Sequence, residues 1–142
     1  MIPNEIRDII RKHPGRVVRS ADEIPKVLSD LRNLGIKTDS QFGEFFLDYT
    51  LAGVLSRRNC ELLDISSPSS EIFIATKFGR DVFGVPGGYA CLTSGENEGF
   101  ILYSISDEHV YDIGVAEIDD LAAGLSSPKW DSFNDLLLWY LK

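Results

Sequence analysis

Two cysteines and two histidines are the residues of this chain best suited to act as nucleophiles, bases or metal ligands. A zinc site takes four nitrogen or sulfur ligands at short spacings, and Cys60, Cys91, His13 and His109 form no such cluster. Cys91 and His109 lie on neighbouring predicted strands and could pair as nucleophile and base. Acidic residues around them would raise the pKa of a thiol, so we expect both thiols to be buried, reduced and inactive. The sequence therefore predicts no metal site.

A glycine-rich stretch at residues 84–88 is the nearest approach to a phosphate-binding loop. Its sequence is Gly-Val-Pro-Gly-Gly, with no Lys-Ser or Lys-Thr pair behind it and no helix expected after it. It therefore matches neither of the common nucleotide-binding motifs, in which glycines lead into a helix N-terminus. The stretch predicts a turn, and the sequence gives no reason to expect a cofactor.

Pairs of carboxylates close in sequence occur three times in the second half of the chain, as Glu96 with Glu98, Asp107 with Glu108, and Asp119 with Asp120. Paired carboxylates hydrolyse glycosides only when they flank one cleft at a set separation, which a sequence does not reveal. Two other interpretations stay open for these residues. They are either solvated turns or the charged rim of a docking surface.

The chain has a formal net charge of −8, and its excess of acidic residues lies in the second part of the sequence. Residues 1–58 carry ten Lys and Arg against eight Asp and Glu, whereas residues 59–142 carry four against fourteen. Such a surface disfavours nucleic acid and attracts a basic partner. No apolar run approaches the ~20 residues that span a bilayer, and the N-terminus has no secretory apolar segment, so a cytoplasmic location is expected.

Helical periodicity occurs at both ends of the chain. The second predicted helix has Ser20 as N-cap with Glu23 three positions later, which is the capping-box spacing. Aromatic side chains at helical spacing in the third helix and in the last one predict a shared core containing Phe45, Phe46 and Phe133, together with Leu137. The predicted helices cover residues 3–13, 20–34, 39–51, 115–124 and 130–141.

Short apolar segments separated by turn residues occupy the middle of the chain. They predict strands at 60–65, 71–76, 81–85, 89–94, 99–105 and 109–113. Strands between two groups of helices predict an α+β fold, with a largely antiparallel twisted sheet and helices at the N- and C-terminal ends. We expect one domain over residues 1–142.

Three segments resemble the SUKH superfamily of Smi–Knr-type proteins. Residues 34–49, Leu-Gly-Ile-Lys-Thr-Asp-Ser-Gln-Phe-Gly-Glu-Phe-Phe-Leu-Asp-Tyr, resemble its entry motif, and residues 111–114 and 130–137 resemble its last strand and closing helix. The order of elements is similar over residues 24–142. The resemblance implies binding without catalysis: many bacterial members neutralise a polymorphic toxin, often a nuclease or deaminase, and other members act as scaffolds in eukaryotes.

The expected partner is therefore a cognate protein toxin with a basic surface. Consecutive turns of a meander lie at opposite ends of its sheet, so the acidic pairs of the two predicted hairpin turns are expected to act separately. Tyrosines near them would serve as anchors, because tyrosine is common among interface hot spots. A regulatory scaffold, or a small enzyme using Cys91 or a carboxylate pair, are the alternatives. The candidate contact residues are Glu96, Glu98, Asp107, Glu108, Tyr89, Tyr103 and Tyr111.

Overall fold

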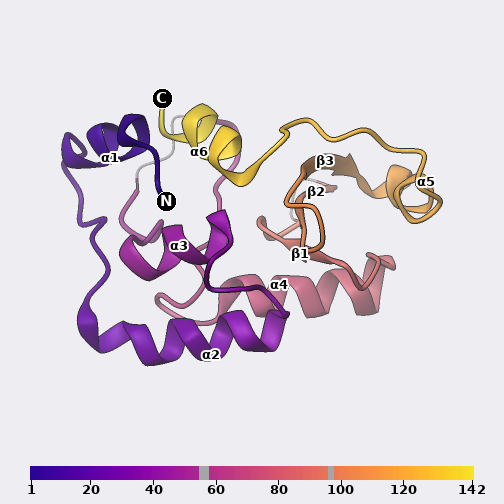
Figure 1. Cartoon of the computed structure of the whole chain (residues 1–142). Coiled ribbons are helices and arrows are strands. Elements are labelled where there is room, and N and C mark those ends of the chain that lie inside the picture. Colours follow the sequence, from indigo (N-terminus) through magenta and orange to yellow (C-terminus); the bar gives the residue numbers. More distant parts are fainter. Residues whose placement is uncertain (55–57, 96–97) are drawn as a thin grey trace.

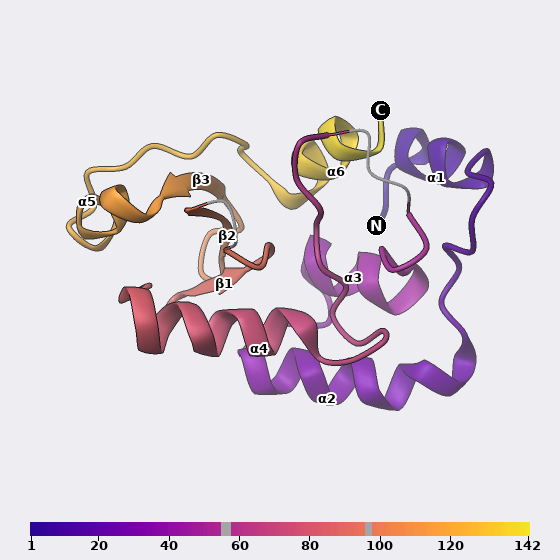
Figure 2. The same cartoon turned by 180° about the vertical axis from the view of Figure 1, so that it is seen from behind.

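A three-stranded antiparallel sheet, drawn as arrows in Figures 1 and 2, lies in the middle of the order of elements. It separates two hydrophobic cores. The structure, a computed structural model, describes residues 1–54, 58–95 and 98–142. Within these residues the sheet has the order β1-β2-β3, and the expected α+β fold with an antiparallel sheet is confirmed. The strands are β1 (Tyr89–Cys91), β2 (Gly99–Ser104) and β3 (Val110–Gly114). The α-helices are α1 (Asn4–Arg11), α2 (Ile24–Leu34), α3 (Gln41–Asp48), α4 (Glu71–Phe78), α5 (Ile118–Ala122) and α6 (Phe133–Leu141).

The central strand β2 is buried on both faces. Ile101 and Tyr103 join a core with residues of α1, α2, α3 and α6, which we call the helical core. Phe100 and Leu102 join a second core with residues of α4 and α5, which we call the α4 core. Because successive side chains of a strand point to opposite faces, one continuous apolar run supplies both cores.

Aromatic rings fill the helical core. The ring of Phe42 lies 4.8 Å from that of Tyr103 and 5.0 Å from that of Phe133, measured between centroids. Phe45 and Phe46 are 1% exposed and pack against the same rings. The two aromatic helices α3 and α6 therefore meet against one face of the sheet, as their sequence pattern predicts.

Side-chain caps place the ends of these helices. Ser40 Oγ accepts a hydrogen bond from the amide of Gly43 at the start of α3, and Ser132 Oγ accepts one from Asp135 at the start of α6. The helices are consequently shorter than the ranges 39–51 and 130–141 predicted for them. Residues 129 and 130 instead pair with β3, where Trp130 forms an isolated antiparallel bridge with Val110.

A buried ion pair joins the N-terminal half of the chain to the segment that follows residue 60. The guanidinium of Arg19 and the carboxylate of Asp64 form two parallel contacts of 3.0 and 3.1 Å, with both side chains fully buried. The remaining N–H groups of Arg19 donate to the carbonyls of Phe46 and Tyr49 and to Glu23. All five donors of the guanidinium are thus used, which is the condition for burying such a charge.

The prediction of a strand at 71–76 is wrong, because this segment is the helix α4. Ile72, Ala75, Thr76 and Gly79 are buried at helical spacing and lie against the sheet. The hydroxyl of Thr76 accepts a hydrogen bond from the amide of Cys91, so the helix covers the outer edge of β1. A short apolar run fits a strand or a buried helix equally well, and here the space beside β1 decided the outcome.

Two further predicted strands are also corrected. Residues 81–85 overlap a π-helical turn, Gly79–Phe83, that continues α4 and ends at Gly84, whose φ is 76°. Residues 60–65 form no strand, although the amide of Leu63 donates to the carbonyl of Leu92 at 2.8 Å. The longest of the described helices, α2, has 11 residues, and none of the described helices is long and apolar enough to cross a membrane.

Candidate protein-binding surface

The structure excludes Tyr103 as a surface anchor, because its side chain has no exposed area. Its ring packs inside the helical core, and its hydroxyl donates to Glu108 at 3.1 Å. Tyr111 is only 8% exposed and meets Tyr89 edge to face, with ring centroids 5.7 Å apart. Of the three predicted tyrosine anchors, Tyr89 is the one that keeps a partly exposed side chain.

Glu108 is a structural carboxylate. Its Oε1 accepts a hydrogen bond of 2.9 Å from the amide of Gln41, the first residue of α3, in addition to the one from Tyr103. A carboxylate at a helix N-terminus satisfies an unpaired amide and interacts favourably with the helix dipole. Glu108 therefore holds the turn between β2 and β3 against α3, and the expectation that it forms a free contact rim is corrected.

Asp107 lies beside Glu108 and interacts within its own turn. It accepts a hydrogen bond from the amide of His109 at 3.0 Å, and its second oxygen lies 3.6 Å from His109 Nδ1. Partial burial opposes ionisation, but the hydrogen bond from the His109 amide and others outweigh it, and the pKa of Asp107 is lowered. The carboxylate is thus charged and about half exposed.

Glu98 is exposed and precedes β2, whereas Glu96 lies outside the described residues. The strand order β1-β2-β3 places the turn containing Glu98 and the turn containing Asp107 at opposite ends of the sheet. The prediction that the two acidic pairs do not form one patch is therefore supported for the described members, Glu98 and Asp107.

Neither thiol is placed as a nucleophile. Cys91 is fully buried in the α4 core, and burial raises its pKa to about 12. Cys91 is at the end of β1 that lies away from the turn containing His109, so Cys91 and His109 do not meet. Cys60 is half-buried rather than buried as predicted, and burial followed by the nearby Asp112 raises its pKa. In the described part of the chain, no group of three or more His, Cys, Asp or Glu side chains could hold a metal ion.

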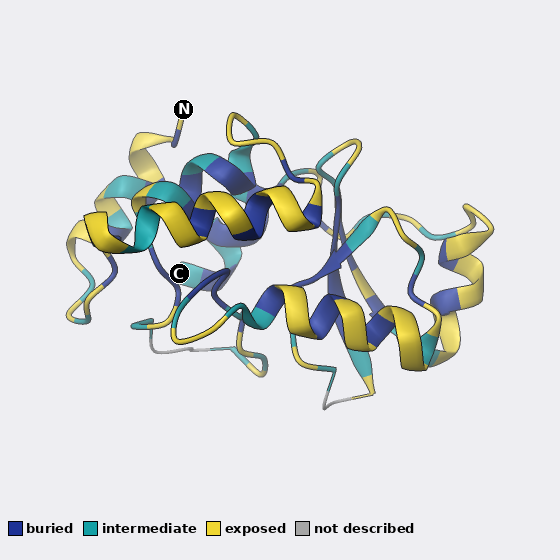
Figure 3. Ribbon diagram, turned by 90° about the horizontal axis from the view of Figure 1, so that it is seen from below, coloured by how far each residue is buried: buried dark blue, intermediate teal, exposed yellow. Residues whose placement is uncertain are grey.

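An apolar groove with a volume of about 510 Å³ runs along α4, and the sequence analysis did not predict it. Two large apolar side chains of the helix line it and remain open to solvent, Ile74 at 58% exposure and Phe78 at 47%. The alternation of exposed and buried residues along the helix is visible in Figure 3. We define the α4 groove by the residues that line it: Leu63, Glu71, Ile74, Ala75, Phe78, Phe83, Ser94 and Gly95.

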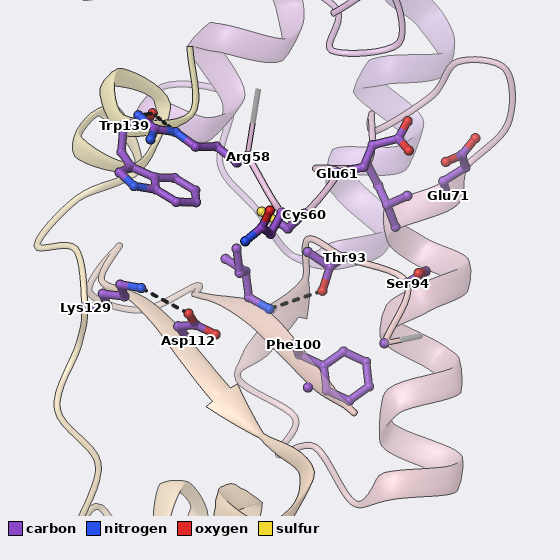
Figure 4. Close-up of a pocket in the computed structure, with 15 residues that line it drawn as sticks. Arg58, Cys60, Glu61, Glu71, Thr93, Ser94, Phe100, Asp112, Lys129 and Trp139 are labelled. Carbon is purple, nitrogen blue, oxygen red and sulfur yellow. Dashed lines mark hydrogen bonds and ion pairs between the residues drawn. The ribbon is translucent and has the colours of Figure 1, made fainter. Parts of the chain in front are cut away.

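A wider polar concavity of about 1170 Å³ continues from the α4 groove, with which it shares Leu63, Glu71, Ser94 and Gly95 (Figure 4). At one end, Arg58 lies over the ring of Trp139 at 4.8 Å and donates to its carbonyl. Lys129 lies 5.8 Å from the same ring and pairs with Asp112 at 3.2 Å. The cations of this concavity are thus engaged at the end that is remote from α4.

The end of the concavity nearest α4 is acidic. Glu61 and Glu71 stand beside each other there (Figure 4), and no Lys or Arg among the described residues forms an ion pair with either. Burial, followed by the negative charges of Asp64 and Glu61, raises the pKa of Glu71. A positive charge placed at this end would be stabilised by both carboxylates.

The amino-acid pattern of α4 contained a signal for this surface. In the sequence Glu-Ile-Phe-Ile-Ala-Thr-Lys-Phe, consecutive apolar residues lie on all sides of a helix. A helix packed on one face of a sheet buries about one stripe, so Phe73, Ile74 and Phe78 necessarily reach the surface. The signal is recognisable only once the segment is known to be helical, and a strand was predicted there.

Comparison with known proteins adds no assignment. No protein-family model matches the sequence, and a search of curated proteins finds no significant match.

Proposed function

We propose that this chain is a non-catalytic protein-binding domain, and specifically a bacterial immunity protein that neutralises a cognate toxin with a basic surface by binding it directly. The resemblance of residues 24–142 to the SUKH superfamily supports the proposal, since that superfamily contains many such proteins. The surface features described above support it independently of the resemblance.

The α4 groove is the observation that carries the proposal. Ile74 and Phe78 expose about half of their surface to water beside a groove floored by Leu63 and Ala75. Apolar side chains gathered at a concave surface with a polar border are typical of protein interaction sites. Scattered exposed hydrophobics would need no such explanation, but these line one groove.

Charge supplies the second argument. Residues 59–142 carry fourteen of the 22 acidic residues and only four of the 14 basic ones, and this part of the chain contains the whole groove. Opposite potentials on two partners accelerate their encounter and suppress binding to partners of the wrong sign. A basic toxin would therefore associate quickly with this surface.

The structural surroundings of Cys91 weigh against the enzyme alternative, because a buried thiol with a raised pKa is a poor nucleophile. The scaffold alternative uses the same surface for another partner. Gene position separates these two, since an immunity gene usually follows the gene of its toxin.

Co-expression tests the proposal. The protein encoded beside this gene is produced in bacteria with and without the chain. We expect the cells that produce it to survive only when they also produce the chain, and the two proteins to form a 1:1 complex on gel filtration. A variant with Cys60→Ala and Cys91→Ala should protect equally well. Toxicity that the chain does not relieve, or protection that is lost with the thiols while the fold persists, would contradict the proposal.

A further inference from the structure

The α4 groove joins two kinds of surface that are complementary to one kind of ligand. Its floor and rim are apolar, through Leu63, Ala75 and Phe78, and its border toward the polar concavity carries Glu71 with Glu61 beside it. We propose that the α4 groove binds an amphipathic helix of the partner protein, whose apolar face fills the groove and whose Lys or Arg side chains meet Glu61 and Glu71. This inference deepens the proposed function and rests on it.

Ile74 and Phe78 provide the exposed apolar surface of the groove. Their side chains are 58% and 47% exposed although the helix that carries them is firmly packed, with Ile72 fully buried and Ala75 nearly so. The exposure is thus a property of the folded surface and not of a loosely attached helix. An amphipathic helix laid in a groove covers such residues with anchors that recur every three or four positions.

The charged part of the argument fixes the sign of the partner. Glu61 and Glu71 repel each other, and burial of Glu71 adds to the cost of its charge, which agrees with its raised pKa. The described cations of the concavity, Arg58 and Lys129, are engaged with Trp139 and Asp112 at the far end. A basic side chain of the partner would compensate the two carboxylates, with which no described Lys or Arg forms an ion pair.

The same charges argue against a second copy of this chain in the groove. A twofold symmetric dimer brings the same patch of both copies together, so Glu61 and Glu71 of one would face those of the other. Four carboxylates would then be brought together and partly desolvated without a cation, in a chain whose net charge is already −8. A basic heterologous segment avoids this cost.

The first experiment uses a designed probe, so that it does not depend on the natural partner. The probe is a helical peptide of about 18 residues made only of leucine and lysine, long enough to hold a helix. Binding to the full chain is followed by backbone amide chemical shifts, and a leucine–glutamate peptide of the same pattern serves as the control. We expect the basic peptide to shift resonances of α4 and residues 63, 94 and 95, and the acidic peptide to bind nowhere.

Matched variants separate the groove from the general acidity of the surface. Ile74 lines the groove and Val82 does not, although their side chains are similarly exposed, at 58% and 57%. The variants Ile74→Ser and Val82→Ser are therefore a matched pair. We expect Ile74→Ser to weaken peptide binding about tenfold and Val82→Ser to change it less than about twofold. Glu61→Lys and Asp81→Lys change the net charge equally, and only the first should weaken binding, by about fivefold.

Several results would overturn the inference. These are shifts that map to another face, equal losses in the matched variants, equal binding of the acidic peptide, or no binding of the basic peptide. A dimer that Ile74→Ser dissolves would show that a second copy occupies the groove instead.

The toxin co-expression assay keeps this failure distinct from failure of the proposed function. If Ile74→Ser and Glu61→Lys still protect cells and still form the complex, the groove is not the contact and the immunity role stands. If the unmodified chain does not protect, the immunity role fails, and the peptide experiment still decides what the groove binds.

Discussion

The two hydrophobic cores on either side of the sheet use their apolar residues differently. The helical core is enclosed by four helices, and the rings of Phe42, Phe45 and Phe46 are no more than 1% exposed. The α4 core has fewer residues, and the helix above it presents Ile74 and Phe78 to solvent. The comparison teaches that a sheet face covered chiefly by one helix leaves more apolar side chains at the surface than a face covered by four, and these are the side chains to which we assign a partner.

The difference between the two cores is tested most directly at Phe46. Phe46→Ala removes a fully enclosed ring that contacts Phe42, Phe45 and Phe133, and we expect a loss of about 3–5 kcal/mol in the free energy of unfolding. Phe78→Ala removes a ring that is 47% exposed, and the expected loss is below about 1 kcal/mol. Urea denaturation measures both, and similar losses for the two rings would remove the distinction.

The buried ion pair gives the next largest effect. Asp64→Ala leaves the guanidinium of Arg19 with Glu23 as its one remaining carboxylate partner. It also leaves three amides, those of Leu51, Ser66 and Ser67, without their acceptor. We expect unfolding to become easier by about 3 kcal/mol, because buried donors of the guanidinium and of the backbone lose their acceptors.

Adding Arg19→Met to Asp64→Ala should recover only part of that loss. The buried charge is then gone, but the amides of Leu51 and Ser66 remain unpaired. A double-mutant cycle in urea checks this, and full additivity of the two substitutions would show that the pair is not coupled.

The α4 core can be stressed at Gly79, a buried residue that directly follows α4. A Cβ atom at this position would lie 2.9 Å from Cys91 Sγ and 3.2 Å from Val85 Cγ2. We expect Gly79→Ala to cost about 1–3 kcal/mol through overpacking, and Cys91→Ala on that background to restore part of it. Gly87→Ala is the control, since nothing lies within 4 Å of its Cβ position. A loss of equal size at Gly87 would contradict the close approach.

The free energy of unfolding should also depend on pH through Glu23, the residue before α2. Its pKa is lowered from 4.5 to about 2 by the hydrogen bond from Ser67 first, and then by those from Arg16 and Arg19, against the opposing effect of burial. Because the folded pKa is below the unfolded one, this stabilisation is present above pH 4.5 and is lost as the pH falls toward 2. We expect a contribution of about 1 kcal/mol, read from thermal unfolding across this range. Glu23→Gln should flatten that part of the profile, and an unchanged profile would assign it to other groups.

The smallest effect is expected at the exposed face of α4. Ile74→Ser should change the free energy of unfolding by less than about 0.5 kcal/mol, because the side chain is 58% exposed. Ile72→Ser, two residues earlier and fully buried, should cost about 3 kcal/mol or more. Chemical denaturation of both variants defines which side of α4 is structural, and a large loss at Ile74 would argue against a binding role.

Local signals predicted much of the helical half. Residues 24–34 and 41–48 lie within the predicted helices, and Ser20 forms the predicted capping box with Glu23. The antiparallel order of the three strands was also predicted, with Asp107 and Glu108 in the turn between the last two. The candidate site was predicted poorly, since Tyr103 and Glu108 proved to be structural and the α4 groove was missed.

The amino-acid sequence by itself determined the features that depend on neighbours along the chain: helix caps, turn residues, the α+β order and the acidic second half. Tertiary structure alone decided that residues 71–78 form a helix, that Arg19 meets Asp64, and that Ile74 faces water while Ile72 does not. The physical reason is distance along the chain. Caps and turns join residues a few positions apart, whereas burial and ion pairing depend on segments that only the fold brings together.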